Sequence, residues 1–529
     1  MDILINTDVI IDISTQRKPN FAKSSAAYAI AKENGHRLWC YTGSLQTLYL
    51  NIVDEVQKSN NALDNGRPRS KIEEESRKLI RAFAKDINWL AALAGDADVF
   101  AGGNPIVNQL TTALERLGDN AKLLTWDDDL LGKSEHAISP EKFVSEFCGS
   151  AQQSIPFIDL AAQQDLLRSQ LERNLHTVLH SGKYILGPEI QELERKLADF
   201  VGVKHAISCS SGTDALLMPL MACDIGPGDA VFTTPFTFIA TAEVIALLGA
   251  TPIFVDIDPR TFNIDPEKLR QAIQQVKAAG KYRPRSIIPV DLFGLPADYD
   301  TIMTIAKEDD LIVLEDAAQG FGGIYKGRQA GSLGHVAATS FFPAKPLGAY
   351  GDGGAIFTDD DELAEKLVSV RVHGKGSHKY ENVRIGLNGR LDTLQASLLL
   401  PKLDIFAQEV ERRQEVASKY TEELSVHSPK LHCPLVPPNV HSAWAQYSLL
   451  CDERREFIIA ELKKGGIPTV IYYPTPLHLQ PAFSNLGYKT GNFPISESIS
   501  QRIFSLPMSP YLTDQQSQRI INTVKNIGL

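Results

Sequence analysis

Residues 339–355 read TSFFPAKPLGAYGDGGA: a β-branched and aromatic run, then a lysine between two prolines, then four glycines. The first part is typical of a buried strand. Pro343 and Pro346 stiffen the flanks of Lys345, and the glycines allow the backbone to pack closely around it. A lysine held in such a turn can form a Schiff base if burial or its neighbours lower its pKa enough to supply a free amine. Most lysines are solvated surface charges, so this interpretation needs support from other segments.

Apolar runs of strand length surround this segment and alternate with helical patterns. They are AISCS (206–210), AVFTT (230–234), PIFVDI (252–257), SIIPVDL (286–292), LIVLEDA (311–317) and VAATSFF (336–342). Near-continuous apolar strands alternating with helices predict a mixed, mostly parallel sheet covered on both faces. A charged helix over residues 409–424 and shorter elements follow. We therefore expect a large α/β lobe over residues 155–400 and a small C-terminal lobe over 401–529.

Two further segments carry candidate functional groups. In SSGTDALLMPL (210–220) a strand leads into a helix whose first N–H groups would suit a phosphate, although a Ser-capped helix without a ligand is the commoner case. The run LIVLEDAAQ ends in Glu315-Asp316, with Gln319 three residues later. Ligands of open α/β sheets lie at the carboxyl ends of strands. Asp316 could therefore hold the pyridine nitrogen of pyridoxal phosphate (PLP), or else cap the next helix.

Five motifs together resemble one family. They are SGTDAL, PFTFIATAEVIALLGATPIFVDID, EDAAQ, SFFPAKPLGAYGDGGA and GLNGRLDTLQA, and in order and spacing they resemble the DegT/DnrJ/EryC1/StrS family of sugar aminotransferases. The resemblance covers nearly all of residues 155–529. It implies a PLP-dependent transferase of fold type I that works as a homodimer with shared active sites.

The resemblance also implies roles for individual residues. Lys345 would bind the cofactor covalently and move the proton, and Asp316 would pair with the pyridinium nitrogen. Other expected cofactor contacts are Gln319 at the ring hydroxyl, Phe238 on the ring face, Gly212, Thr213 and Ser340 at the phosphate, and Asn388 reaching the phosphate from the other subunit.

Substrate residues follow from the same resemblance. SGKYILGPEI (181–190) would place Gly182 and Tyr184 against the sugar nucleotide. Arg390 would meet a substrate carboxylate from the neighbouring subunit, since its planar fork of donors suits that anion. An interface salt bridge is the alternative for Arg390.

The run SFFPxKPLGxYGDGGAIFT most resembles the enzymes that aminate a UDP-linked 2-acetamido-3-keto-glucuronate. Two positions depart from that pattern. Tyr472-Tyr473 stands where His-Tyr is expected, and Ala344 replaces a serine. The first departure removes a possible cationic contact with the sugar carboxylate, so a neutral 3-keto or 4-keto sugar stays open as the substrate.

The first 148 residues form a separate module, followed by a polar linker at 149–154. LINTDVIIDI and LLTWDDD resemble strands of a PIN-type fold, a small α/β domain that in nucleases collects carboxylates around a metal. Asn6 and Thr47 stand where acids are usual. The acids left are Asp8, Asp12 and Asp127, with Asp96 and Asp98 nearby in sequence. Since metal-assisted hydrolysis needs several anionic oxygens, we expect a binding or scaffolding role rather than a nuclease, and we predict no metal site.

Composition sets outer limits on function. A formal net charge of −11 weighs against a nucleic-acid-binding surface over the whole molecule. Six scattered cysteines without a CxxC pair favour a reducing cytoplasm, and the sequence contains no apolar run long enough to span a membrane.

The sequence thus predicts an aminotransferase. It would move an amino group, from L-glutamate by the family resemblance, onto a nucleotide-diphosphate-linked keto sugar such as a UDP-3-keto-hexose or hexuronate, for cell-surface polysaccharide. The alternative is a regulatory or binding protein with a PLP fold, fused to a PIN-type metal-dependent ribonuclease.

Overall fold

The chain divides into two units, Met1–Ser154 and Ile155–Leu529. This computed structural model describes residues 155–378 and 380–528, and in the first unit only Ser139 and five strands. These strands are β1 (Asp2–Ile5), β2 (Arg37–Tyr41), β3 (Asn88–Leu90), β4 (Lys122–Leu124) and β5 (Ala137–Ile138). They form one parallel sheet in the order β3-β2-β1-β4-β5, and parallel sheets are typical of α/β domains. The positions weighed for a metal site (Asn6, Asp8, Asp12, Thr47, Asp96, Asp98, Asp127) lie outside the described residues.

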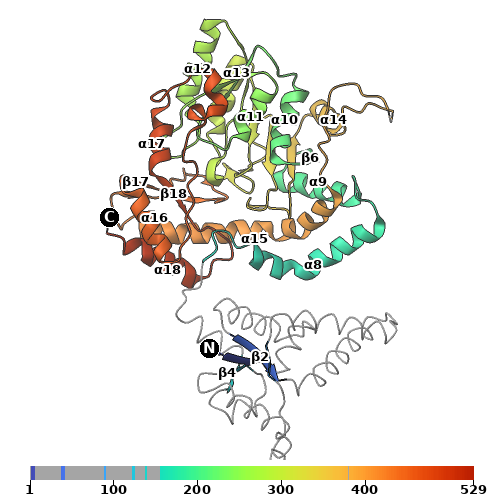
Figure 1. Cartoon of the computed structure of the whole chain (residues 1–529). Coiled ribbons are helices and arrows are strands. Elements are labelled where there is room, and N and C mark those ends of the chain that lie inside the picture. The colour runs from blue at the N-terminus through green and yellow to red at the C-terminus, as the bar shows by residue number, and fades with distance from the viewer. Residues whose placement is uncertain are drawn as a thin grey trace, which may run out of the picture. The chain divides into compact units, whose positions relative to one another are not determined.

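A seven-stranded sheet forms the centre of the second unit, in the order β6-β14-β13-β10-β9-β7-β8 (Figure 1). Its strands are β6 (His205–Cys209), β7 (Asp229–Thr233), β8 (Thr251–Phe254), β9 (Arg283–Ile287), β10 (Ile312–Asp316), β13 (Val336–Ser340) and β14 (Gly354–Thr358). Only β14 runs antiparallel to its neighbours. The mostly parallel sheet predicted from the apolar runs is confirmed.

One predicted strand ends earlier than its apolar run. We expected a strand over 286–292, but β9 ends at Ile287 and Val290 makes only an isolated bridge to Asp316. Pro289 lies between them and has no N–H for a sheet ladder. Its carbonyl instead accepts a hydrogen bond from the N–H of Asp316 at 2.9 Å. Val290 pairs with Asp316 in the same parallel register as β9, so the chain continues beside the end of β10.

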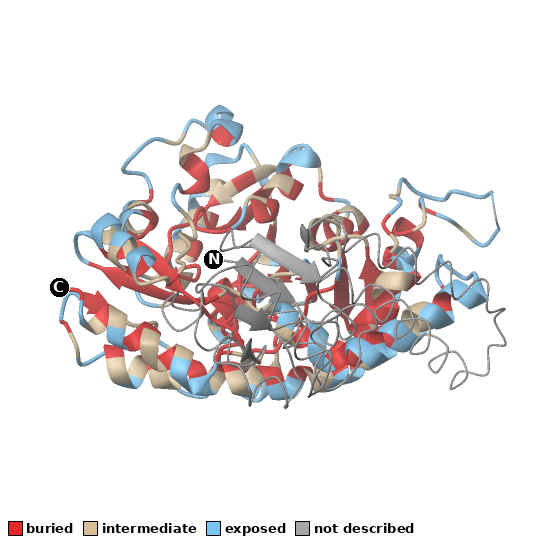
Figure 2. Cartoon of the chain, turned by 60° about the horizontal axis from the view of Figure 1, so that its bottom comes forward, coloured by how far each residue is buried: buried red, intermediate tan, exposed pale blue. Residues whose placement is uncertain are grey.

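Helices cover both faces of this sheet, because successive strand residues point to opposite sides. In β13, Val336 and Ala338 pack on one face and Ala337 packs on the other. The first face carries α10 (Gly212–Ala222), α11 (Ala240–Leu247) and α14 (Asp361–Val370). The second carries α9 (Pro188–Val201), α12 (Pro266–Ala279), α13 (Tyr299–Asp309) and the first half of α15 (Thr393–Leu424). Figure 2 shows buried strands in red between helices whose outward residues are pale blue.

The C-terminal part has a hydrophobic core of its own. A small antiparallel sheet, β15 (Leu431–His432), β17 (Tyr447–Cys451) and β18 (Ile503–Leu506), packs with α16 (Arg455–Lys464), α18 (Asp514–Lys525) and the end of α15. The lobe boundary drawn at 400/401 falls inside α15, which contributes to both cores. We expected this helix to begin at residue 409, but it begins at Thr393. Its first half is apolar, mostly buried and contains Pro401, so the charged pattern shows only the second half.

The remaining elements complete the second unit. They are α8 (Leu160–Ser181), η3 (Leu292–Gly294), β11 (Ile324–Tyr325), β12 (Arg328–Gln329), β16 (Val440–His441), η4 (Leu477–Leu479), η5 (Pro481–Leu486) and α17 (Pro494–Arg502). Among the described residues, no helix combines the length and the apolar character needed to cross a membrane.

Candidate active site

Asp316 is the last residue of β10, at the carboxyl edge of the large sheet. Its Oδ2 accepts a hydrogen bond of 2.8 Å from the hydroxyl of Thr241 on α11, and its Oδ1 accepts one of 3.2 Å from the N–H of Ala318. Burial raises the pKa of the Asp316 carboxyl, while these hydrogen bonds and the charge of Lys345 act to lower it. The carboxylate is therefore buried, fixed in orientation and close to a lysine.

Lys345 lies in the tight turn that follows β13. Its N–H donates to the carbonyl of Phe342 at 2.9 Å, and a Cβ at Gly348 would lie 2.4 Å from the carbonyl oxygen of Pro343. Only glycine fits there, as the Gly-rich sequence indicated. Burial lowers the pKa of Lys345, against the opposing effect of Asp316. The turn thus favours the free amine that Schiff-base chemistry requires.

A cradle for an anion lies beside these two groups. The helix α10 begins at Gly212, capped by Ser211, whose hydroxyl accepts a hydrogen bond from the N–H of Asp214 at 3.0 Å. A Cβ at Gly212 would lie 2.6 Å from Cβ and 2.8 Å from Oγ of Ser340, the last residue of β13. Gly212, Thr213 and Ser340 therefore meet at one helix N-terminus. Exposed N–H groups and the helix dipole favour a phosphate at such a place.

Gln319 is held from two sides. Its Oε1 accepts a hydrogen bond of 2.7 Å from the N–H of Phe293, and its Nε2 donates to the hydroxyl of Tyr473 at 3.0 Å. Tyr473 also packs edge-on against Phe236, with ring centroids 6.1 Å apart. Burial raises the pKa of Tyr473, so its hydroxyl stays neutral. Tyr473, expected at the substrate, thus contacts an expected cofactor residue.

Sequence reasoning gave no role to Thr241 or Phe293. Thr241 lies in a quoted motif, and the only signal was its spacing from Thr237, four residues earlier, where the chain enters a helix after a strand. The two hydroxyls lie 3.1 Å apart. Phe293 contributes a backbone N–H, which no sequence pattern could single out.

Other predicted residues make no hydrogen bond with Lys345 or Asp316 in the described part of one chain. Phe238 is 55% exposed and Asn388 is also exposed. The carbonyl of Gly389, next to Asn388, accepts a hydrogen bond from the N–H of Ser210, just before the cradle. The Nε of Arg390 is buried without a hydrogen-bond partner.

The segment expected to bind the sugar nucleotide lines a hollow of about 540 Å³, formed by residues 182–188 and Gln191. Gly182 ends α8 in the left-handed conformation, with φ of 67°. Tyr184 is 45% exposed, and its backbone carbonyl accepts a hydrogen bond from the N–H of Thr393. Tyr472 is half-buried and packs against Phe157.

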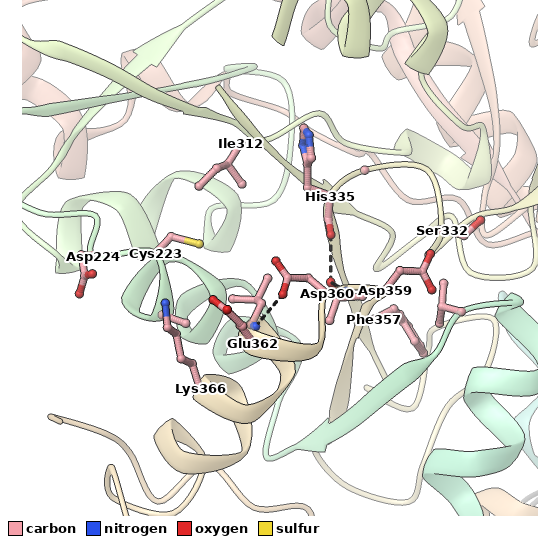
Figure 3. Close-up of a pocket in the computed structure, with 16 residues that line it drawn as sticks. Cys223, Asp224, Ile312, Ser332, His335, Phe357, Asp359, Asp360, Glu362 and Lys366 are labelled. Carbon is pink, nitrogen blue, oxygen red and sulfur yellow. Dashed lines mark hydrogen bonds between the residues drawn. The ribbon is translucent and has the colours of Figure 1, made fainter. Parts of the chain in front are cut away.

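Another hollow, of about 660 Å³, lies at the opposite edge of the sheet, where Cys223, Glu362 and Lys366 gather (Figure 3). Ile312 in its lining begins β10, whereas Asp316 ends that strand. None of the buried, unpartnered polar atoms among the described residues lies in this lining. This hollow therefore lies at the other end of β10 from the candidate active site.

A lysine with a lowered pKa, a buried carboxylate and a helix N-terminus suited to an anion meet at the carboxyl edge of a mostly parallel α/β sheet. Together with the family match, they give the class of protein: an aminotransferase. The chain belongs to the DegT/DnrJ/EryC1/StrS aminotransferase family, whose model matches residues 166–525. Both the predicted family and the predicted enzyme class are confirmed.

Individual relatives agree with this assignment. The chain is 49% identical over 367 residues to a UDP-2-acetamido-2-deoxy-3-oxo-D-glucuronate aminotransferase of Pseudomonas aeruginosa, covering 69% of this chain and 98% of the relative. A crystal structure of a family aminotransferase from Brucella abortus is 50% identical, with a TM-score of 0.68, over 70% of this chain and 98% of that one. A putative sugar aminotransferase of Streptococcus pneumoniae in its PLP form is 29% identical, with a TM-score of 0.62, over 68% and 95%.

Proposed function

We propose that this chain uses PLP, carried by Lys345, to transfer an amino group from L-glutamate to a UDP-linked 3-keto hexose or hexuronate. The observation that carries the proposal is the pairing of Lys345 with Asp316: burial shifts the pKa of each group, and each charge acts on the other. The name of the Pseudomonas aeruginosa relative supports a 3-keto sugar as the substrate.

The described residues fit this cofactor. Gly212 packs so closely against Ser340 that a Cβ there would lie 2.6 Å from the Cβ of Ser340, and a phosphate suits the N-terminus of α10 that begins at this contact. When bound, PLP supplies an electron sink for the substrate carbanion. Asp316, fixed by Thr241, would hold the proton on the ring nitrogen.

Lys345 would take the proton from the substrate carbon and return it, which its lowered pKa permits. Gln319, fixed by Phe293 and Tyr473, would donate to the ring hydroxyl. Phe238 would cover the ring face.

We further propose that a second copy of the chain completes the site. Exposed apolar side chains lie in the segments that carry predicted site residues: Ile185 is 56% exposed, Phe342 51% and Ile385 85%. Such surface is usual for an interface. Asn388 would then reach the partner's phosphate, and Arg390 a substrate carboxylate, while Gly182, Tyr184 and Tyr472 would contact the sugar. The reaction would take place in the cytoplasm and serve cell-surface polysaccharide.

The test is a spectroscopic titration of the purified full chain. L-glutamate should bleach the absorbance band of the lysine-bound cofactor, and a UDP-linked 3-keto sugar should restore it. Lys345→Ala, as the control, should lack the band. A panel of UDP- and dTDP-linked 3-keto and 4-keto sugars identifies the acceptor. No band in the unaltered protein refutes the proposal, and restoration by 4-keto sugars alone refutes its substrate part.

For the unit Met1–Ser154 we propose a binding or scaffolding role. Metal-dependent cleavage of single-stranded RNA by the full chain, abolished by Asp127→Ala, would overturn it.

A further inference from the structure

Two carboxyl groups are buried together beneath the candidate cofactor site. Asp291, in the segment after β9, and Glu315, the residue before Asp316, are both 0% exposed. Oδ1 of Asp291 accepts hydrogen bonds from the hydroxyl of Tyr299 at 2.8 Å and from the N–H of Ala297 at 3.1 Å. The carboxylate of Glu315 accepts three backbone N–H groups, from Gly331, Leu333 and Gly334.

One oxygen of this pair has no donor. Oδ2 of Asp291 is buried without a hydrogen-bond partner. The parallel register of Val290 with Asp316 places the Asp291 and Glu315 side chains on the same face of the sheet, and each carboxyl affects the pKa of the other. Gly320 packs against Asp291, since a Cβ there would lie only 2.6 Å from Oδ2. Two ionised carboxylates in such contact would repel each other, whereas one proton between them satisfies the bare oxygen.

The hydrogen bonds decide which residue carries the proton. Three N–H donors favour an ionised Glu315. Asp291 receives two donors, both on Oδ1, so its Oδ2 is free to carry a proton and donate it to Glu315. Burial and the charge of Glu315 raise the pKa of Asp291 well above its ordinary value, while Tyr299 and Ala297 act to lower it.

Backbone hydrogen bonds connect this pair to the cofactor site. The N–H of Asp291 donates to the carbonyl of Asp316 at 3.0 Å, and the N–H of Phe293, two residues on, donates to Oε1 of Gln319 at 2.7 Å. A contact between Asp291 and Glu315 therefore holds the segment that carries both hydrogen bonds.

We propose that Asp291 and Glu315 share one proton, and that this neutralised contact positions Asp316 and Gln319 for the cofactor. The positioning role rests on the proposed function, but the shared proton does not. The other titratable groups around the pair are Tyr299 on α13 and Asp316 on β10, with Lys345 beyond Asp316. Ionised Asp291 would add a second negative charge beneath Asp316, so the contact should weaken as pH rises through the raised pKa of Asp291.

Two matched amide variants test which of the two carboxyl groups carries the proton. In Asp291→Asn, Oδ1 still accepts from Tyr299 and Ala297, and the NH₂ group donates to Glu315, as the protonated acid would. In Glu315→Gln, one carboxylate oxygen becomes an NH₂ group. That group must face either the N–H of Gly331 or the N–H groups of Leu333 and Gly334, so that two donors point at each other. We expect Asp291→Asn to retain PLP as the unaltered chain does at neutral pH and to lose less at alkaline pH. Glu315→Gln should retain PLP on the order of tenfold more weakly.

The infrared band of a protonated carboxyl, recorded on the full chain stripped of PLP, tests the proton itself. The unaltered protein should show this band at neutral pH, and Asp291→Asn should show less of it even if Glu315→Gln does not fold. The inference would be overturned if the unaltered protein and Asp291→Asn showed this band at equal intensity. It would also be overturned if Asp291→Asn and Glu315→Gln lost PLP equally. An infrared difference without any cofactor band in the unaltered protein would refute the proposed function and leave the shared proton standing.

Discussion

Thr241→Val should lower the rate of the reaction with glutamate, because it removes one hydrogen bond to Asp316. The Thr241 hydroxyl is the only side-chain donor to Oδ2 of Asp316 among the described residues, at 2.8 Å, and Thr241 is 1% exposed. Water is therefore poorly placed to replace the hydroxyl. A hydrogen bond to a charged group contributes about 1.5–3 kcal/mol. If that energy holds Asp316 against the ring nitrogen in the transition state, the rate falls about 10- to 150-fold.

Single-turnover bleaching of the cofactor band by glutamate measures this loss. Thr237→Val is the matched control, because the hydroxyl of Thr237 contacts Thr241 at 3.1 Å but makes no hydrogen bond with Asp316. Thr237→Val should raise the activation free energy by less than about 1.5 kcal/mol. Urea unfolding of the cofactor-free chain tests the same hydrogen bond in another way. Thr241→Val should lower the free energy of unfolding more at pH 8 than at pH 4, because the hydrogen bond is strongest when Asp316 is ionised. An unchanged bleaching rate, or equal losses in both variants, refutes the reasoning.

Three further predictions follow from other contacts. Gly212→Ala places a methyl group 2.6 Å from Cβ of Ser340 and should cause PLP to be lost on dialysis. An unchanged PLP content would show that Gly212 and Ser340 do not hold the phosphate. Lys402, buried with Nζ donating to the carbonyl of Gly348 at 2.7 Å, has its pKa lowered by burial to about 8. Since the unfolded chain binds the proton more tightly, urea unfolding should show stability rising between pH 8 and 10, and Lys402→Met should reduce that rise. Arg390→Lys should raise KM for a carboxylated sugar about tenfold and leave neutral sugars unaffected, because lysine cannot form the planar fork; equal effects on both would assign Arg390 to the interface.

The parts of the fold that depend on local pattern could be predicted. The apolar runs at 311–317 and 336–342 contain β10 and β13, whose ends carry Asp316 and Ser340. The glycine-rich turn around Lys345 also followed from the sequence, because a close backbone approach demands glycine.

The parts that depend on long-range contact could not. Thr241 lies 75 positions from Asp316, and Phe293 lies 26 positions from Gln319. The pairing of Asp291 with Glu315 needs the segment after Pro289 to stay in register beside β10, which the bridge between Val290 and Asp316 shows. One sequence shows which side chains are polar, but it does not show which of them the sheet order brings together.

The dipeptide Glu315-Asp316 depends both on local sequence pattern and on long-range contacts. Adjacent strand residues point to opposite faces, so one carboxyl faces α11 and the other faces the turn at 331–334. A buried carboxylate needs a cation, donors or a proton to remain there. Asp316 has the charge of Lys345 nearby and two donors, an arrangement that leaves it able to take a new partner. Glu315 has three backbone donors and the acid of Asp291, an arrangement already complete. On the proposed function, strand geometry thus divides two acids that look equivalent in the sequence into one that would meet the cofactor and one that would hold the site in place.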